Sequence, residues 1–217
     1  MRILFVNPNS TVSMTEKIEA AARAAAAPDV TVEARTSHGG PPAIQGREDG
    51  EAAVAPLLKE LARGVDDGFD AFVIACFDDT GLAEARAATG RPVIGIGQSA
   101  FHAAAMRGAR FSVVTTLAVS VPVIEENLAA SGLDRVCPRV RASGVPVLAL
   151  ETDPEPSERA VSGEIGRALA EDDIGAVVLG CAGMADLAAR MTRAHGLPVI
   201  DGVAAACGFA RTLVTLA

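Results

Sequence analysis

Residues Phe69–Gly81 read FDAFVIACFDDTG, and this stretch predicts how the chain is built. The apolar run Ala71–Ile74 is typical of a strand buried on both faces of a sheet, and Leu82–Arg86 is typical of the first turns of a helix. Cys76 lies between the two, at the carboxyl end of the strand. Free N–H groups and the dipole of a helix N-terminus lower the pKa of a nearby thiol, so we expect Cys76 to form a thiolate readily.

The same construction occurs a second time, around Cys181. Residues 174–190 read IGAVVLGCAGMADLAAR, again an apolar strand, a cysteine and a helix. The two cysteines are 105 residues apart (76 to 181), and the prolines of the following segments RPVIG and LPVID are 106 residues apart (92 to 198). Because the chain has 217 residues, this period predicts two halves that share one supersecondary plan.

Strands and helices are expected to alternate along both halves. Most of the expected strands are short apolar runs, such as Ile3–Val6 and Val145–Leu150. This order predicts an α/β fold in two similar halves, each a mainly parallel sheet flanked by helices. We place the first half, or lobe, at residues 1–97 and the second lobe at residues 98–204.

Parallel sheets bind ligands at the carboxyl ends of their strands. In this chain that edge would bring together the polar loops that follow four of the expected strands. The residues expected there include Asn9, Ser10, Cys76, Phe77, Asp78, Thr115, Thr116, Cys181, Ala182 and Gly183. A lone cysteine in an apolar strand is usually a small buried side chain, but two at equivalent positions of a repeat indicate a shared function.

Composition and charge argue against several classes of function. The net charge is −8 and the chain has no Trp or Tyr, so it lacks the positive charge and the stacking side chains that nucleic-acid binding needs. No run approaches the ~18 apolar residues of a membrane span, and the first residues are too few in apolar side chains for a signal peptide. We expect a cytoplasmic protein that binds no membrane and whose cysteines stay reduced.

Cofactor motifs in the sequence are weak. Gly95–Ala100 matches the G-x-G-x-x-A pattern of dinucleotide-binding folds, but no Asp or Glu occurs between Arg86 and Ile124, where that fingerprint needs one. The three histidines are scattered, with no spacing to other ligands that suits a metal. Asp78 and Asp79 could orient a base or bind a substrate N–H, or they could cap a helix. We therefore expect no cofactor and no metal.

Two thiols on opposite sides of a ligand suit the inversion of a carbon centre. This reaction needs one group that removes a proton from one face and another that supplies a proton to the other face. An adjacent carbonyl must acidify the C–H bond, and backbone N–H groups of the strand-end loops can stabilise the enolate oxygen. A redox disulfide is the other chemistry open to two cysteines.

Several motifs resemble those of the hydantoin racemases, which belong to the aspartate/glutamate racemase superfamily. They cover essentially the whole chain and read NPNST (7–11), VIACFDD (73–79), PVIGIG (92–97), RFSVVTT (110–116), VPVLAL (145–150) and VLGCAGM (178–184). The resemblance implies that the halves are two pseudo-symmetric lobes with an active site between the lobes. It implies two-base proton transfer by Cys76 and Cys181 without a cofactor. It also implies that the last helix (205–217) crosses back and completes the first lobe.

The residues beside the cysteines bear on the substrate. Amino-acid racemases of the superfamily have Asn-Thr after the first cysteine and Thr-His after the second, whereas this chain has Phe77-Asp78 and Ala182-Gly183. The difference favours a neutral cyclic or ureido substrate, so the resemblance implies racemisation of 5-monosubstituted hydantoins. The pocket residues that it implies are Asn9, Ser10, Ile44, Thr115 and Thr116.

Other functions stay open on the sequence. Allantoin is itself a 5-substituted hydantoin, so allantoin racemase is a close alternative. Another enzyme of the superfamily, such as an amino-acid racemase or an arylmalonate-type decarboxylase, and a non-catalytic small-ligand binding protein are more distant ones. We expect a small cyclic ureide as the binding partner, and association of identical chains into a homo-oligomer.

Overall fold

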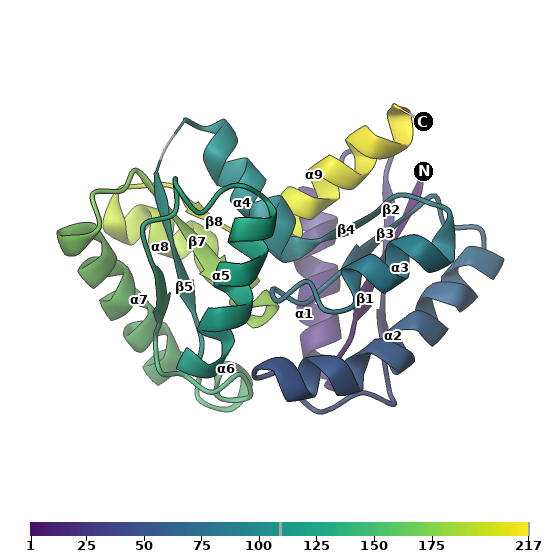
Figure 1. Ribbon diagram of the computed structural model, residues 1–217, viewed down its shortest axis with the longest axis horizontal. Helices are drawn as coiled ribbons and strands as arrows, with labels where there is room; N and C mark the ends of the chain where they lie inside the picture. The colour runs from purple at the N-terminus through teal and green to yellow at the C-terminus, as the bar shows by residue number, and fades with distance from the viewer. Residues whose placement is uncertain (109, 217) are drawn as a thin grey trace.

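Helices and strands alternate through the computed structural model, which describes residues 1–108 and 110–216 (Figure 1). The elements of the first half, in chain order, are β1 (Arg2–Asn7), α1 (Val12–Ala25), β2 (Thr31–Thr36), α2 (Arg47–Asp66), β3 (Ala71–Ile74), α3 (Leu82–Thr89) and β4 (Val93–Gly95). Those of the second half, with η for short 3-10 helices, are α4 (Ile96–Met106), β5 (Phe111–Thr115), η1 (Ala118–Ser120), α5 (Val121–Ala130), β6 (Val140–Ala142), α6 (Ala149–Thr152), α7 (Pro154–Glu171), β7 (Ala176–Gly180), η2 (Ala182–Leu187), α8 (Ala188–His195), β8 (Val199–Ile200) and α9 (Gly202–Thr215).

Two four-stranded sheets form the frame of the molecule, one in each half of the chain. Their strand orders are β2-β1-β3-β4 and β6-β5-β7-β8, and neighbouring strands run parallel in both. The central strands β3 and β7 are buried along their whole length, as their apolar sequences predict. The predicted α/β fold with two pseudo-symmetric lobes is confirmed.

The strand order creates a switch point beside the first strand of each sheet. From β1 the chain moves outward to β2 and then returns to β3 on the other side of β1, and β5, β6 and β7 repeat this path. Loops that leave two such neighbouring strands diverge, which opens a crevice at the carboxyl ends of the strands. The loop after Asn7 and the loop that contains Cys76 leave this edge of the first sheet. The loops that contain Thr116 and Cys181 leave the same edge of the second sheet.

Each of the helices α4 and α9 packs against the sheet that it does not directly follow in the chain. α4 follows β4 but contacts β7 and β8, whereas α9 follows β8 and contacts β1, β3 and β4. Arg211 of α9 pairs with Asp29, with 3.1 Å between Nε and Oδ1, so both chain ends lie on the same side of the molecule (Figure 1). One apolar core, which contains Phe5, Phe101 and Phe111, joins the two sheets. The boundaries of the lobes at residues 97 and 204 stay a prediction, and Ala217 lies outside the described residues.

One predicted strand is wrong. The edge strand beside β5 is β6, Val140–Ala142, whereas the segment Val145–Leu150, which was expected to be a strand, lies outside the sheet. Pro146 has no N–H to give to a strand ladder, and the N–H of Val147 instead donates to the side-chain oxygen of Gln45, 3.0 Å away. Three of its apolar residues are buried nevertheless: Val145 and Leu150 pack in the core of the second lobe, and Val147 packs against the first lobe. The apolar pattern of this segment therefore reflects burial without a place in a sheet.

Candidate active site

Both cysteines line one small cavity between the lobes. Cys76 follows β3 of the first sheet and Cys181 follows β7 of the second, so each lobe supplies one thiol. The cavity has a volume of about 30 Å³, which leaves room for little more than water. The other predicted site residues that line it are Asn9, Ile44, Phe77, Asp78, Thr116, Ala182 and Gly183.

Two predicted pocket residues lie outside this cavity. The backbone N–H of Ser10 donates to the carbonyl of Pro41, 2.8 Å away, in the loop before α2. Thr115 is buried in β5, and its hydroxyl donates to the carbonyl of Gly180, also at 2.8 Å. Thr115 therefore holds the end of β7 in place, directly before the second cysteine.

Several side chains that line the cavity were not predicted from the sequence. Met14 and Ile18 lie one turn apart on α1, Ser120 ends η1, and Val147 belongs to the segment that was expected to be a strand. The i, i+4 spacing of Met14 and Ile18 marks a buried face of α1, and that helix begins just after the predicted Asn9 loop. This signal could have located the two residues at the site.

The loop that follows the first cysteine is held by Asp79. Its carboxylate accepts the backbone N–H groups of Gly97, at 2.9 Å, and of Gln98, at 2.6 Å, at the start of α4. A methyl group added at Gly95 would overlap this carboxylate, and one at Gly97 would overlap the carbonyl of Phe77. The G-x-G spacing thus permits close approach of the cysteine loop. Asp79 caps a helix, one of the two interpretations left open above, although burial raises its pKa to about 7.

Asp78 is the carboxyl group of the cavity wall. Its backbone carbonyl accepts the side-chain amide of Asn127, 2.9 Å away, which joins it to α5 of the second lobe. Within the described residues, no donor is hydrogen-bonded to its carboxylate oxygens, and burial raises the pKa of this group to about 7. An ionised Asp78 also raises the pKa of both cysteines, so it lies within electrostatic reach of each.

The two thiols are harder to ionise than predicted. Burial, followed by the charge of Asp78, raises the pKa of Cys76 well above its usual range, and burial raises the pKa of Cys181 to about 11. The helix effect is weak because α3 begins only at Leu82 and Cys181 is followed by a 3-10 helix. The predicted lowering of the thiol pKa by a helix N-terminus is therefore wrong at both positions.

Hydrogen bonds and one positive charge oppose part of the rise in thiol pKa, and they act unequally on the two cysteines. The hydroxyl of Thr80 donates to the Sγ atom of Cys76, 3.6 Å away. The backbone N–H of Gly183 bonds to Cys181, and the charge of Lys17 further favours the thiolate there. Since the pKa of Cys181 rises less, it is the easier of the two thiols to ionise.

Polar contacts between the lobes close the cavity. The pairs that bridge the two lobes beside it are Lys17–Glu151, Gln45–Val147, Arg47–Glu126 and Asp78–Asn127. Met14, Ala43 and Val147 form an apolar cluster against Cys181 beneath these contacts. These contacts narrow the way to the two thiols, which are partly exposed.

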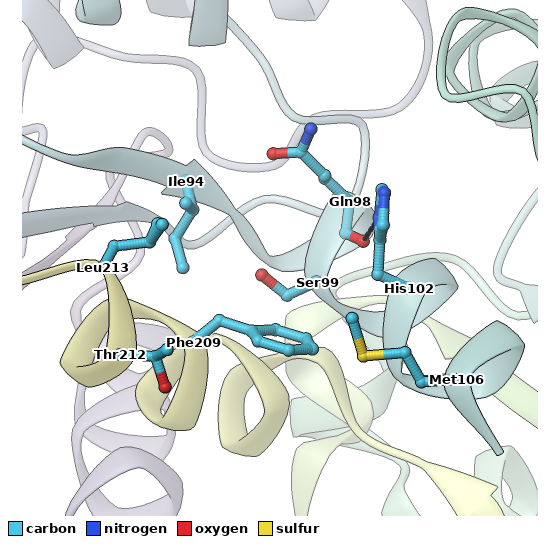
Figure 2. A pocket seen from close by; sticks show the side chains of 8 residues that line it. All are labelled: Ile94, Gln98, Ser99, His102, Met106, Phe209, Thr212 and Leu213. Atoms are coloured by element: carbon cyan, nitrogen blue, oxygen red, sulfur yellow. Dashed lines mark hydrogen bonds between the residues drawn. The ribbon is translucent and has the colours of Figure 1, made fainter. Parts of the chain in front are cut away.

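A larger hollow lies on the surface between α4 and α9, with a volume of about 180 Å³. Figure 2 shows that α9 contributes Phe209 and Leu213 to this hollow, and α4 contributes Met106 and His102. The ring Nδ1 of His102 lies 2.8 Å from the carbonyl oxygen of Gln98. Among the residues that the structure describes, no cysteine and no carboxylate line this hollow. The smaller cavity between the thiols is therefore the candidate active site.

Over residues 1–108 and 110–216, no three His, Cys, Asp or Glu side chains are grouped closely enough to hold a metal ion. In the same part of the chain, none of the helices is both long enough and apolar enough to cross a membrane. Cys76 and Cys181 are both free thiols.

The fold and the paired thiols define a two-lobe α/β protein of the racemase type. A sequence profile of the Asp/Glu/Hydantoin racemase family matches residues 3–210, so the chain belongs to this family. The resemblance inferred from the motifs is thereby confirmed.

Relatives with names support the same class of enzyme. The chain is 46% identical to a hydantoin racemase of Rhizobium meliloti, over 99% of this chain and 89% of the relative. It is 40% identical to a hydantoin racemase of Pseudomonas sp. (strain NS671), over 100% of this chain and 87% of the relative. The solved structure of an allantoin racemase from Klebsiella pneumoniae superposes with a TM-score of 0.96 at 43% identity and covers 100% of this chain and 88% of that one. The chain is therefore an isomerase, a racemase, as predicted.

Proposed function

We propose that the protein racemises 5-monosubstituted hydantoins by two-base proton transfer between Cys76 and Cys181, without a cofactor. The observation that carries this proposal is the shared cavity, to which each lobe contributes one free thiol from the equivalent strand end. The hydantoin racemases among the relatives support the substrate class.

The proton balance of the reaction needs one thiolate and one thiol. The thiolate takes the hydrogen of C5, the electron pair of the C–H bond moves into the adjacent carbonyl to form an enolate, and the opposite thiol then protonates C5 from the other face. The enzyme ends with the two protonation states exchanged. Cys181, the more easily ionised thiol, is the base for one enantiomer, and Cys76 is the base for the other.

The cavity wall offers partners for the polar groups of the ring. The side-chain NH₂ of Asn9 donates to the thioether Sδ of Met14, at 3.4 Å, and a thioether is a weak acceptor. Its oxygen accepts from Asn7 and Thr11, which holds the side chain in place, so the NH₂ group can donate to a ring carbonyl instead. The carboxylate of Asp78 accepts a ring N–H in this proposal, and Ile44 and Thr116 border the ring.

Substrate entry requires the cavity to open. A five-membered ring with two carbonyl groups is several times larger than a water molecule, whereas the cavity measures about 30 Å³. Ala43 and Val147 belong to the apolar cluster beside Cys181, and Gln45 accepts the N–H of Val147, so we propose that the loop 43–45 and the segment around Val147 move apart to admit the ring.

Allantoin racemase is the second candidate. The support is the structural similarity to the Klebsiella pneumoniae allantoin racemase at 43% identity. Allantoin carries a ureido group at C5 of the same ring, so both candidates use one mechanism and differ only in the substituent. A screen of allantoin against aryl- and alkyl-hydantoins by polarimetry distinguishes them.

The path of the proton tests the mechanism. The reaction starts from one pure enantiomer in D₂O and stops at a few per cent conversion, and the enantiomers are then separated and weighed by mass spectrometry. The delivering thiol carries solvent deuterium, so the product should be almost fully deuterated at C5 while recovered substrate stays mostly protiated. Substantial protium in the early product, after correction for uncatalysed exchange, would rule out two opposed bases.

A further inference from the structure

A second hollow adjoins the thiol cavity and shares Asp78 with it. Its volume is about 210 Å³, and it lies at the mouth of the cleft between the first turns of α2, the loop after Cys76 and α5. Gly46 and Gly50 at the start of α2 and Val123 of α5 belong to the uncharged part of its wall. The hollow therefore borders the site at Asp78 and involves elements of both lobes.

The chemistry of racemisation fixes where a 5-substituent must go. C5 becomes planar in the enolate, so its substituent lies in the plane of the ring, between the two thiols and not towards either of them. One subsite therefore serves both enantiomers, and it must open sideways from the space between the cysteines. The hollow beside Asp78 meets this requirement, whereas the thiol cavity of about 30 Å³ has no room for a substituent.

The charges around this hollow are mostly negative. Its lining includes four acidic residues, Glu51, Asp78, Asp79 and Glu84, against a single arginine, Arg47, although the carboxylate of Asp79 is already bonded to α4. Both Nη2 contacts of Arg47 go to the carboxylate of Glu126, at 2.8 Å each, so its charge is already balanced. A negatively charged substituent would meet several carboxylates here, whereas N–H donors would meet acceptors.

We propose that the hollow beside Asp78 is the subsite for the 5-substituent, and that it selects substituents that carry N–H donors and no negative charge, such as a ureido or carbamoyl group. This inference rests on the proposed function and adds the chemical class of the substituent. Asp78 lines both the thiol cavity and the hollow, which puts it at the junction between ring and substituent, and Asn127 of the second lobe holds its backbone carbonyl.

A matched pair of substrates tests the charge preference. Hydantoin-5-acetamide and hydantoin-5-acetate have nearly the same shape and differ in charge and in N–H donors. Racemisation is measured by circular dichroism at low ionic strength and above about pH 8, where Asp78 and Asp79, with pKa values of about 7, are ionised. We expect kcat/KM for the amide to exceed that for the carboxylate by about tenfold or more, and allantoin to exceed 5-benzylhydantoin.

Variants of α2 locate the effect. Glu51→Gln and Glu51→Lys should reduce the amide-to-carboxylate ratio by about threefold and about tenfold respectively, because they remove or reverse one charge of the wall. Glu48→Gln is the matched control, since Glu48 is exposed on the same helix turn and does not line the hollow. The control should keep the wild-type ratio.

The outcomes separate this inference from the proposed function. If 5-methylhydantoin is racemised but the carboxylate reacts as well as the amide, or 5-benzylhydantoin reacts better than allantoin, the subsite proposal is wrong and the racemase proposal stands. An equal ratio in the Glu51 variants and the wild type also contradicts the subsite. If no hydantoin is racemised, 5-methylhydantoin included, the proposed function fails, and the subsite falls with it.

Discussion

The two lobes repeat an ion pair along with their strands, and they bury it to different extents. In the first lobe Arg35 of β2 reaches Asp67, the residue after α2, with 2.8 Å between Nη2 and Oδ2. In the second lobe Arg141 of β6 reaches Asp172, the residue after α7, with 2.6 Å between Nη2 and Oδ1. The two arginines hold equivalent registers beside the first strand of each sheet. The side chains of the first pair are 22% and 50% exposed, those of the second only 6% and 2%.

This difference shows that an equivalent position does not carry an equivalent free energy. An exposed ion pair contributes about 0–1 kcal/mol to stability, whereas removal of one partner of a buried pair costs about 3–5 kcal/mol because a buried charge is left without compensation. The second lobe also surrounds Arg141 with Glu164 and Glu171. The repeat therefore conserves geometry, while local packing sets how much each contact matters.

The two lobes also differ in the residue that caps the helix after their fourth strand. In the first lobe Asp79, from the cysteine loop itself, caps α4. In the second lobe α9 is capped by Asp201, whose carboxylate accepts the N–H groups of Val203 at 3.0 Å and Ala204 at 2.9 Å. The repeat equivalent of Asp201 is Gly95, where a side chain would overlap Asp79. The first cysteine loop is thus tied to a helix of the core, and the second turns directly into η2.

The largest expected effect comes from removal of either thiol. Cys76→Ala and Cys181→Ala should each lower the rate of racemisation by about 10²–10⁴-fold or more, because every turnover needs both groups. Each variant keeps one base, so it should still exchange the C5 hydrogen of one enantiomer with D₂O, and the two variants should act on opposite enantiomers. Proton NMR of each pure enantiomer in D₂O measures this exchange.

Cys137→Ala and Cys207→Ala serve as controls, since neither residue lines the cavity and both should retain racemisation. A folded Cys181→Ala enzyme that racemises at the wild-type rate would contradict the two-base mechanism. So would single variants that exchange both enantiomers equally, because that result would mean that the thiols do not face opposite sides of the ring.

The next effect concerns stability and the paired arginines. Arg141→Met should lower the free energy of unfolding by about 3–5 kcal/mol, whereas Arg35→Met should lower it by about 1 kcal/mol or less. Urea unfolding of the two variants at neutral pH makes the comparison. Equal losses would show that the burial of the second pair has no energetic consequence.

The ion pair between Arg141 and Asp172 also predicts how acid affects the stability of the protein. The hydrogen bonds and charge of Arg141 lower the pKa of Asp172 below its ordinary value. A carboxyl group with a lowered folded pKa stabilises the fold above its unfolded pKa, of about 3.9, and this contribution is lost as the pH falls below about 4. Wild-type stability should therefore fall more steeply in this range than that of Arg141→Met, as measured by urea unfolding at stepwise lower pH.

Much of the frame was readable from the sequence because it depends on local patterns. The apolar runs of β1, β3 and β7 are continuous, and the spacing of 105 residues between Cys76 and Cys181 revealed the repeat and, with it, the two thiols. The ion pairs carry the same signal, since Asp67 and Asp172 are also 105 residues apart (67 to 172). This spacing indicates that the two ion pairs hold equivalent positions. It does not indicate how deeply each pair is buried, because burial depends on packing by distant segments.

The parts that sequence reasoning missed depend on contacts between the lobes. Val147 reads as a strand residue, and only the other lobe explains why it is buried without a sheet. The pKa of Cys76 depends on burial by residues far along the chain, which outweighs the local helix effect assumed from the sequence. Met14 and Ile18 carry a helical pattern, but the pattern alone does not say which cavity their face meets.

The two helix caps give a smaller effect that separates stability from catalysis. Asp79→Ala and Asp201→Ala each leave two N–H groups of a helix end without an acceptor, so each should cost about 0.5–2 kcal/mol of stability. Only Asp79→Ala frees a cysteine loop, so it alone should lower kcat, by about tenfold, with little change in KM. Thermal unfolding and steady-state kinetics check the pair, and equal kcat values would contradict a positioning role for Asp79.

The smallest expected effect is the order in which the two thiols react with iodoacetamide. The thiolate is the reactive form, and the pKa of Cys181, at about 11, lies below that of Cys76. Each unit of pKa difference favours the Cys181 thiolate by about tenfold, but a more basic thiolate is also a better nucleophile, so we expect Cys181 to be labelled about threefold to tenfold faster. Both thiols line one cavity, so the opening that admits the reagent affects them alike and cancels in the ratio. Peptide mass spectrometry at low conversion measures this ratio.

The Asp78→Asn variant should speed the labelling of both thiols, because the charge of Asp78 raises both pKa values. Faster labelling of Cys76 would reverse the assignment of the more easily ionised thiol and, with it, the electrostatic difference between the two lobes.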